Sequence, residues 1–561
     1  MFYPLRQLCF VSLLGAAAPS LPVHGAPPDP APRLAVVIAV DQFRFDYLQR
    51  FRPYLGEGGF KKLLEGGADY EECHYRHAIT KTAPGHATIL SGVNANIHGI
   101  VGNEWLDRAS WLVMNAVEDP DSPIVGGPAG VPHSPGGLLE RKSGRSPLNF
   151  RATTVGDQLK LRFGAMSRVI SVSNKDRAAI LLGGKLADAV YWQENDRFVS
   201  SRFYATALPA WVTNFNHRDL IKGYFGQAWT RLLPAAAYDR VQGPDDVDGE
   251  TLKFGYTHNF PHRIDGGHPD LRSSYYDAFE VGPYSSEVLG QFAIAALHAE
   301  RLGQHPHTDL LCISFSQIDH VGHEFGPDSQ EMMDSVLRLD GILARVIAAV
   351  EQQVGAGNFI LVLTADHGSA PLPEKINAMA RGIPAARYNG AAMDKAVSEA
   401  LTAAFGALPS KEFWATRDNF GYTFHPSALA ARGVTLAQAA AVLKPVIGAF
   451  PEIYTVYSTE ELNLPDPQTD SVADMSRRSF FPGRSTDVEF VFRPYMMDRD
   501  RFGINHGTPW DYDTHVPMLW YGAGVTPGVH VEAVNVEDLA PTLAAHLEVP
   551  RPPQARGHRL F

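Results

Sequence analysis

Four mostly apolar runs mark out the framework of the chain, and the first of them is rich in β-branched residues. They cover residues 34–40, 169–173, 309–315 and 359–363. Runs of this length without polar alternation are typical of strands that are buried on both faces of a parallel sheet.

Segments with the apolar spacing of helices lie between and after these runs. They cover residues 60–67, 153–161, 285–302, 328–353 and 535–547. The alternation predicts an α/β fold built on a doubly wound, mostly parallel sheet. The core pattern resumes late in the chain, at residues 506–508 and in the apolar run 516–521.

Three regions break this rhythm, and we expect them to be insertions beside the core. Residues 104–147 are rich in Pro, Gly, Ser and Asp, residues 188–277 are rich in aromatics, and residues 382–502 combine Ala-rich segments with a polar stretch. Together with the framework, they predict one catalytic domain over residues 33–561, with insertions at about these three places.

Acidic residues and histidines cluster where the predicted strands end. Asp41 follows the first run, Asp366 and His367 follow the fourth, and Asp319 and His323 follow the third at a spacing that shares one face of a helix. Ligand sites in open α/β sheets lie beyond the carboxyl ends of the strands. For Asp41 alone, a helix-capping role is an equal alternative.

The late His506 completes a set of six candidate metal ligands: Asp41, Asp319, His323, Asp366, His367 and His506. Mixed carboxylate and imidazole donors suit zinc, and six are enough for two zinc ions with open positions. We leave His86 and His98 out of this set, because one falls within a predicted helix and the other beside a glycine turn.

The stretch T-A-P-G-H from Thr82 predicts a nucleophile at the start of a short helix. Pro84 fits the first helical turn and Gly92 can close the helix. Free N–H groups at such a position favour an anion. A threonine hydroxyl needs a base or a metal to become a nucleophile. Thr80 is a less well placed rival, and the direction of Lys81 is open.

The charge of the chain limits its possible partners, and its first residues indicate the cellular compartment. The 561-residue chain carries a formal net charge of -12 and has no basic cluster, which argues against nucleic acid. Residues 1–25 read as a signal peptide and residues 26–32 as a linker, so we expect a periplasmic or secreted protein without a stable membrane span. Cys73 and Cys312 could pair after export, but two distant cysteines leave this open.

Taken in order, these motifs resemble the alkaline phosphatase superfamily, and most closely its secreted bacterial phosphatases that use a threonine nucleophile. The motifs are Asp41, T-A-P-G-H at Thr82, G-N at Asn103, K-D-R at residues 175–177, D-H-V-G-H at residues 319–323, A-D-H-G at residues 365–368 and H-G at His506. The branch is related to type I phosphodiesterases and nucleotide pyrophosphatases. The fold implied is an alkaline phosphatase-like sheet with inserted cap or crown regions.

The resemblance implies two zinc ions per subunit and a phosphothreonine intermediate on Thr82. One ion would be held by Asp41, Asp366, His367 and the Thr82 oxygen. The other would be held by Asp319, His323 and His506. Asn103, Lys175 and Arg177 would bind the phosphoryl oxygens.

The expected activity is hydrolysis of small phosphate monoesters, because two cations suit a dianion. The main alternative is a phosphodiesterase or nucleotide pyrophosphatase. A sulfatase is weaker, since Thr82-Ala-Pro-Gly lacks the arginine of that family's motif. From another class, the chain could be an inactive metal-binding protein. The sequence does not indicate the oligomeric state or the physiological substrate.

Overall fold

A computed structural model describes residues 31–127, 144–379, 381–408, 413–418, 420–465, 469–499 and 501–561. The expected signal peptide, most of the expected linker and residues 128–143 of the first expected insertion lie outside the described residues.

An eleven-stranded sheet forms the centre of the molecule, in the order β22-β2-β21-β14-β1-β13-β8-β9-β10-β6-β7. Its middle is parallel and consists of β14 (Phe359–Thr364), β1 (Leu34–Val40), β13 (Asp309–Phe315), β8 (Val169–Ser173) and β9 (Ala189–Glu194). Every residue of β1, β8, β13 and β14 is buried. The predicted α/β fold with a mostly parallel sheet is confirmed.

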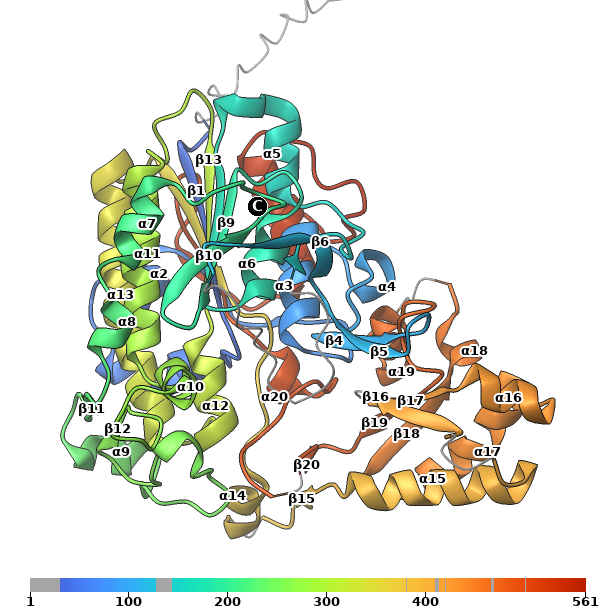
Figure 1. Ribbon diagram of the computed structural model, residues 1–561. Helices are drawn as coiled ribbons and strands as arrows, with labels where there is room; N and C mark the ends of the chain where they lie inside the picture. The colour runs from blue at the N-terminus through green and yellow to red at the C-terminus, as the bar shows by residue number, and fades with distance from the viewer. Residues whose placement is uncertain are drawn as a thin grey trace, which may run out of the picture.

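Helices cover both faces of this sheet (Figure 1). On one face, α11 (Tyr284–Ala299) and α13 (Gln330–Val354) pack against β8, β13 and β14; on the other, α3 (Thr82–Ser91), α5 (Val155–Phe163) and α6 (Asp176–Gly183) pack together. Each of these helices begins and ends within a few residues of its predicted bounds, where a bound was predicted. Further elements of the fold are α2 (Phe60–Gly66), α10 (Ser273–Val281), α12 (Gln317–Phe325), α20 (Asp511–Thr514), α21 (Leu539–His546) and β3 (Cys73–His74).

Both edges of the sheet contain antiparallel pairs. On one side lie β21 (Met518–Gly522), β2 (Ala68–Tyr70) and β22 (Gly528–His530), and on the other lie β10 (Arg197–Ser201), β6 (Glu118–Val125) and β7 (Gly144–Arg145). The central sheet therefore takes β6, β7, β9 and β10 from the regions expected as insertions at 104–147 and 188–277. The sequence E-D-P-D-S-P-I-V of β6 shows no strand pattern, and its prolines are accommodated where the pairing with β7 is irregular, between Glu118 and Pro123.

Residues 382–502 contain a smaller unit with its own sheet and core, drawn in orange in Figure 1. Its antiparallel strands are β16 (Ala415–Asp418), β17 (Gly421–Phe424), β19 (Val488–Phe492) and β18 (Ile453–Ser458). Two helices, α15 (Gly390–Phe405) and α17 (Leu436–Gly448), pack against each other beside this sheet. Apolar side chains such as Leu443 and Phe490 form a separate hydrophobic cluster there.

A buried glutamate in this unit gives a pH-dependent contribution to stability. Glu489 of β19 is 3% exposed, and burial raises its pKa from 4.5 to about 8. Because the folded pKa is the higher one, stability is full below about pH 4.5 and is lost as the pH rises towards 8, at about 1.4 kcal/mol per pH unit. We expect Glu489→Gln to flatten this decline. Thermal unfolding of both proteins between pH 5 and 9 measures it, and parallel curves would contradict it.

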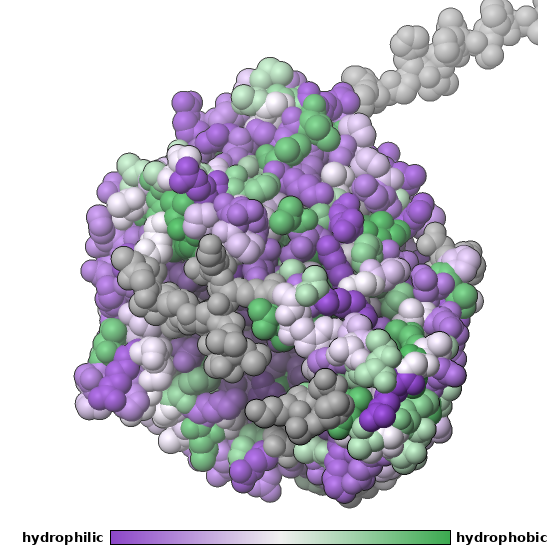
Figure 2. Space-filling view, turned by 45° about the vertical axis from the view of Figure 1, so that its right-hand side comes forward, coloured by the Kyte–Doolittle hydropathy of each residue, from purple (hydrophilic) through white to green (hydrophobic). Residues whose placement is uncertain are grey.

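The outer face in Figure 2 is mostly hydrophilic, with hydrophobic residues scattered over it. Within the described ranges, no helix combines the length and apolarity needed to cross a bilayer. Cys73 and Cys312 are both buried free thiols, so the pairing that the sequence left open is not formed.

Candidate active site

Four neighbouring parallel strands bring the candidate residues together beyond the carboxyl ends of the strands. Asp41 directly follows β1, and Asp366 lies two residues beyond β14. The register of β1 with β13 runs in step from Leu34 opposite Asp309 to Val40 opposite Phe315, so the strands end at the same level. This alignment converts distant sequence positions into a common site.

The first group of candidate ligands consists of Asp319, His323 and His506, whose donor atoms lie within 4.8 Å of one another. Nε2 of His323 is 3.2 Å and Nε2 of His506 is 3.6 Å from Oδ1 of Asp319. α12 supplies the first two residues from adjacent turns, as their spacing predicted.

Backbone carbonyl groups orient the two imidazoles of this group. Nδ1 of His323 is 2.9 Å from the carbonyl oxygen of Ile504, and Nδ1 of His506 is 2.7 Å from that of Thr80. A neutral imidazole that donates from Nδ1 keeps a lone pair on Nε2. Metal-binding histidines are held in this way.

The second group gathers around His367. Its Nε2 is 3.4 Å from Oδ1 of Asp41 and 3.5 Å from Oδ2 of Asp366, while its Nδ1 is 2.9 Å from the carbonyl oxygen of Gly368. Asp41, Asp319 and His367 also place donor atoms within 4.8 Å of one another, so Asp319 adjoins both groups.

Unpartnered polar atoms show that the second group fits a metal ion. Oδ1 of Asp41, Oδ2 of Asp366 and Nε2 of His367 are buried and form no hydrogen bond, although Nδ1 of His86 lies 3.1 Å from that oxygen of Asp366, and all three residues are fully buried. Orphaned buried polar atoms are costly. Three such donors that face one another are the atoms that a cation would satisfy.

Burial and neighbouring charges shift the pKa values of these histidines. Burial opposes the charge of His367, but Asp366 and Asp41 outweigh it and raise the pKa of His367 to about 9. Burial lowers the pKa of His506 well below its usual value, and the neighbouring His367 and His323 add to this. His506 is therefore neutral at pH 7, the state in which imidazole binds a metal.

Lys175 joins the two groups. It precedes α6, and its Nζ is 2.7 Å from Oδ2 of Asp41 and 2.5 Å from Oδ2 of Asp319. Burial lowers the pKa of Lys175, but Asp319 and Asp41 outweigh it and give a net rise. Burial likewise opposes the charge of Asp319, but His323 and Lys175 hold the pKa of that carboxyl well below its usual value. An ammonium and ionised carboxylates thus share the centre of the site.

Arg177 and Asn103 are placed differently. Arg177 lies in the first turn of α6, and its Nε is buried without a hydrogen-bond partner. Oδ1 of Asn103 accepts a hydrogen bond of 2.8 Å from the N–H of Ala83, the residue after Thr82. Asn103 is therefore beside the start of α3.

Thr82 is the first residue of α3 and is 1% exposed. Gly92 ends this helix in the left-handed conformation, as predicted. Gly85 lets the helix approach the site, because a Cβ there would lie 2.2 Å from the carbonyl oxygen of Asp366. The rival hydroxyl of Thr80 donates instead to the carbonyl oxygen of Thr508.

Lys81 extends towards the inserted unit of residues 382–502. Its Nζ lies 4.8 Å from the ring centroid of Phe420, a cation–π contact. Burial lowers the pKa of Lys81, while Asp498 and Asp418 attract its charge. Lys81 thus links the residue before Thr82 to that unit.

Two residues outside the predicted set of ligands support the ligand groups: Gln42, which the sequence did not indicate, and His86, which was considered and left out. Nε2 of Gln42 donates to Oδ1 of Asp319 at 2.7 Å, and its N–H donates to Oδ1 of Asp366 at 3.1 Å. Nδ1 of His86 is 2.8 Å from the carbonyl oxygen of Thr82 and 3.1 Å from Oδ2 of Asp366. Since Nε2 of His86 contacts Ser314, its ring positions the site without serving as a ligand.

Comparison with known proteins gives one family and several full-length relatives. Residues 35–469 match the family model described as type I phosphodiesterase / nucleotide pyrophosphatase. A protein named calcium-transporting ATPase from Myroides odoratus is 32% identical, with 93% of this chain and 92% of the relative covered. Alkaline phosphatase PhoV from Synechococcus elongatus is also 32% identical, with 94% and 92% covered.

A solved structure resembles the whole fold. The crystal structure of wild-type alkaline phosphatase PafA has a TM-score of 0.84 at 30% identity, and the match covers 95% of this chain and 98% of the other. The likeness therefore extends across the insertions as well as the central sheet.

Proposed function

Since the chain belongs to the type I phosphodiesterase / nucleotide pyrophosphatase family, within the PafA/PhoV-like alkaline phosphatase branch of the alkaline phosphatase superfamily, we propose that it is a zinc-dependent phosphomonoesterase. The substrates are small phosphate esters, and the products are an alcohol or phenol and inorganic phosphate. Full-length similarity to named alkaline phosphatases supports this proposal.

Six side chains would hold two zinc ions. Asp41, Asp366 and His367 would bind one ion together with the Thr82 oxygen, and Asp319, His323 and His506 would bind the second. The gathered donors and the unpartnered atoms of the second group support this assignment. When bound, zinc would supply Lewis acidity that lowers the pKa of hydroxyl groups and stabilises negative charge on phosphate oxygens.

Thr82 would act as the nucleophile. Its hydroxyl oxygen forms a bond to phosphorus as the ester oxygen leaves, which gives phosphothreonine, and water then hydrolyses this ester in a second displacement. Asn103, Lys175 and Arg177 would bind the non-bridging oxygens. The residues mainly position the phosphoryl group and neutralise its charge.

One observation favours monoesters over diesters: the cations Lys175 and Arg177 both follow β8, at the same end of the parallel strands as the carboxylates. A phosphate monoester carries two negative charges at alkaline pH and a diester carries one. Two cations next to the phosphoryl site compensate the second charge. The family model also describes diesterases, so the diesterase remains the second candidate function.

Turnover of an aryl monoester and the matching aryl diester by the purified protein tests the proposal. We expect a higher kcat/KM for the monoester, with an optimum at alkaline pH. Equal or faster diester turnover would refute the monoesterase proposal.

A lysine substitution separates the two candidate functions. Lys175→Ala is expected to lower kcat/KM for the monoester by about 10²-fold or more, because it removes a charge contact at the phosphoryl site. The diester rate should change much less. Lys160→Ala is the matched control, since Lys160 forms a 2.8 Å ion pair with Asp188 elsewhere. Zinc content must be measured in parallel, because Lys175 also contacts Asp41. Little loss of turnover for either ester at full zinc content would favour the diesterase.

We also propose export to the periplasm or the medium, on the basis of the apolar run in the first 25 residues. Cell fractionation and N-terminal sequencing test it. Cleavage after Ala18 or Gly25 is expected, and an uncleaved chain in the cytoplasm would contradict it.

A further inference from the structure

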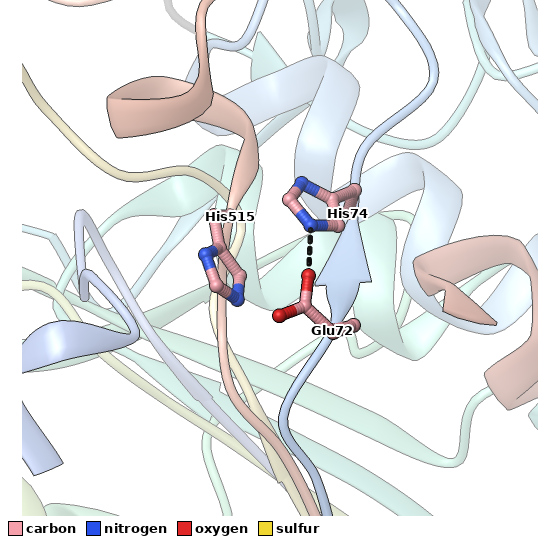
Figure 3. A group of neighbouring side chains, drawn as sticks. All are labelled: Glu72, His74 and His515. Carbon is pink, nitrogen blue, oxygen red and sulfur yellow. Dashed lines mark hydrogen bonds and ion pairs between the residues drawn. The ribbon is translucent and has the colours of Figure 1, made fainter. Parts of the chain in front are cut away.

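A second cluster of metal-binding side chains lies outside the candidate active site. It consists of Glu72, His74 and His515, which come from the β3 region and from the residue that follows α20 (Figure 3). Their donor atoms all lie within 4.8 Å of one another. Nε2 of His74 is 3.4 Å from Oε2 of Glu72. Nothing in the proposed phosphatase reaction uses these residues.

The two segments that supply the cluster are fixed relative to each other. A β-bridge joins His74 to His515. The N–H of Tyr75 donates to the carbonyl oxygen of Thr514, and the N–H of Val516 donates to that of Cys73, both at 3.0 Å. The backbone therefore determines how closely the two imidazoles can approach.

Ring stacking also orients His515. The rings of His74 and His515 stack with centroids 4.4 Å apart, and Phe45 stacks on His515 at the same separation. His515 is held against both rings, so its nitrogens have a defined direction. A preoriented ligand loses little conformational entropy when a metal binds.

A backbone carbonyl group also holds the ring of His515 in place. Nε2 of His515 is 2.6 Å from the carbonyl oxygen of Glu71 and donates to it. Coordination of zinc through this nitrogen would replace that hydrogen bond.

We propose that Glu72, His74 and His515 bind a further zinc ion, apart from the two proposed at the active site. One carboxylate and two imidazoles are a donor set that zinc accepts, and water would complete the tetrahedral shell, since Glu72 is exposed. The site would be structural, because the cluster contains neither Thr82 nor any of the six candidate ligands of the active site.

This ion would stabilise the segment that supports His506. Asp513 lies two residues before His515, and its Oδ2 accepts hydrogen bonds from the N–H groups of Gly507 at 3.1 Å and Thr508 at 2.8 Å. Zinc would link β3 to this segment. The expected effect is a higher melting temperature without a change in the chemistry of the active site.

Zinc content tests the proposal. Wild-type protein, Glu72→Gln and His74→Ala are dialysed to equilibrium against the same buffered free zinc, and zinc per chain is measured by mass spectrometry. Each variant is expected to hold one zinc fewer than wild type, with monoester turnover retained. His530→Gln is the matched control, because His530 is also a histidine paired with a glutamate, Glu532 at 3.2 Å, but does not belong to the cluster; it should match wild type.

Crystals of the zinc-loaded wild type provide an independent measurement. An anomalous peak at the zinc edge is expected between Glu72, His74 and His515. Glu72→Gln keeps the test decisive if His74→Ala does not fold, because Glu72 is exposed. Equal zinc content in wild type and Glu72→Gln, or no anomalous peak at the cluster, would overturn the proposal.

Discussion

Replacement of Thr82 by alanine is expected to lower kcat/KM for an aryl monoester by about 10⁴-fold or more, because it removes the proposed nucleophile. Folding should be retained: the side chain loses one oxygen and one methyl group, and the contacts that place α3 come from Gly85 and His86. Thr82→Ser keeps a hydroxyl at this position and should retain far more activity. Steady-state rates of the three proteins at equal zinc content give the comparison.

Two other threonines serve as controls for this substitution. Thr88 is buried in the same helix, and its hydroxyl donates to the carbonyl oxygen of Pro84 at 3.0 Å; Thr80 is the rival hydroxyl. Neither Thr88→Ala nor Thr80→Ala should abolish activity. Acid quenching during turnover, followed by peptide mass spectrometry, should find phosphate on Thr82. Phosphate on Thr80, or an active Thr82→Ala protein, would show that the nucleophile is assigned wrongly.

The centre of the fold could be predicted from the sequence because burial on both faces leaves a simple pattern. All seven residues of β1 are apolar and buried, and β13 and β14 are buried throughout as well. Parallel strands that share a register end together, so the acidic residues that follow them had to converge. The i,i+4 spacing of Asp319 and His323 then placed both on one face of α12.

The sheet edges could not be predicted in the same way. β6 contains two prolines and three acidic residues in eight positions, and only its pairing with β10 and β7 makes it a strand. Tertiary pairing overrides weak local preference at such positions. β9 and β10 were hidden for another reason, since they begin an aromatic-rich region whose later part forms helices outside the sheet.

The supporting residues of the site left no pattern in the sequence. Gln42 has a positive φ of 61°, which turns the chain after Asp41 and lets its side chain reach Asp319. Gly322 is needed beside it, because a Cβ there would lie 1.8 Å from Oε1 of Gln42. The glycine of D-H-V-G-H therefore has a steric reason, which only the packing of α12 against this turn reveals.

Removal of metal is expected to abolish activity and to destabilise the fold. Asp41, Asp319 and Asp366 are at most 2% exposed, and Lys175 is the only lysine that contacts them among the ion pairs of the described residues. Without bound cations, these carboxylates repel one another in a medium of low polarity, which is costly.

Dialysis against a chelator should lower monoester turnover by about 10³-fold or more, since several kcal/mol of charge stabilisation are lost. The melting temperature should fall at the same time, and zinc should restore both quantities. Calcium and magnesium should restore neither, because His323, His367 and His506 supply nitrogen donors that these ions bind poorly. Full activity after metal analysis shows no remaining zinc would contradict the proposed centre.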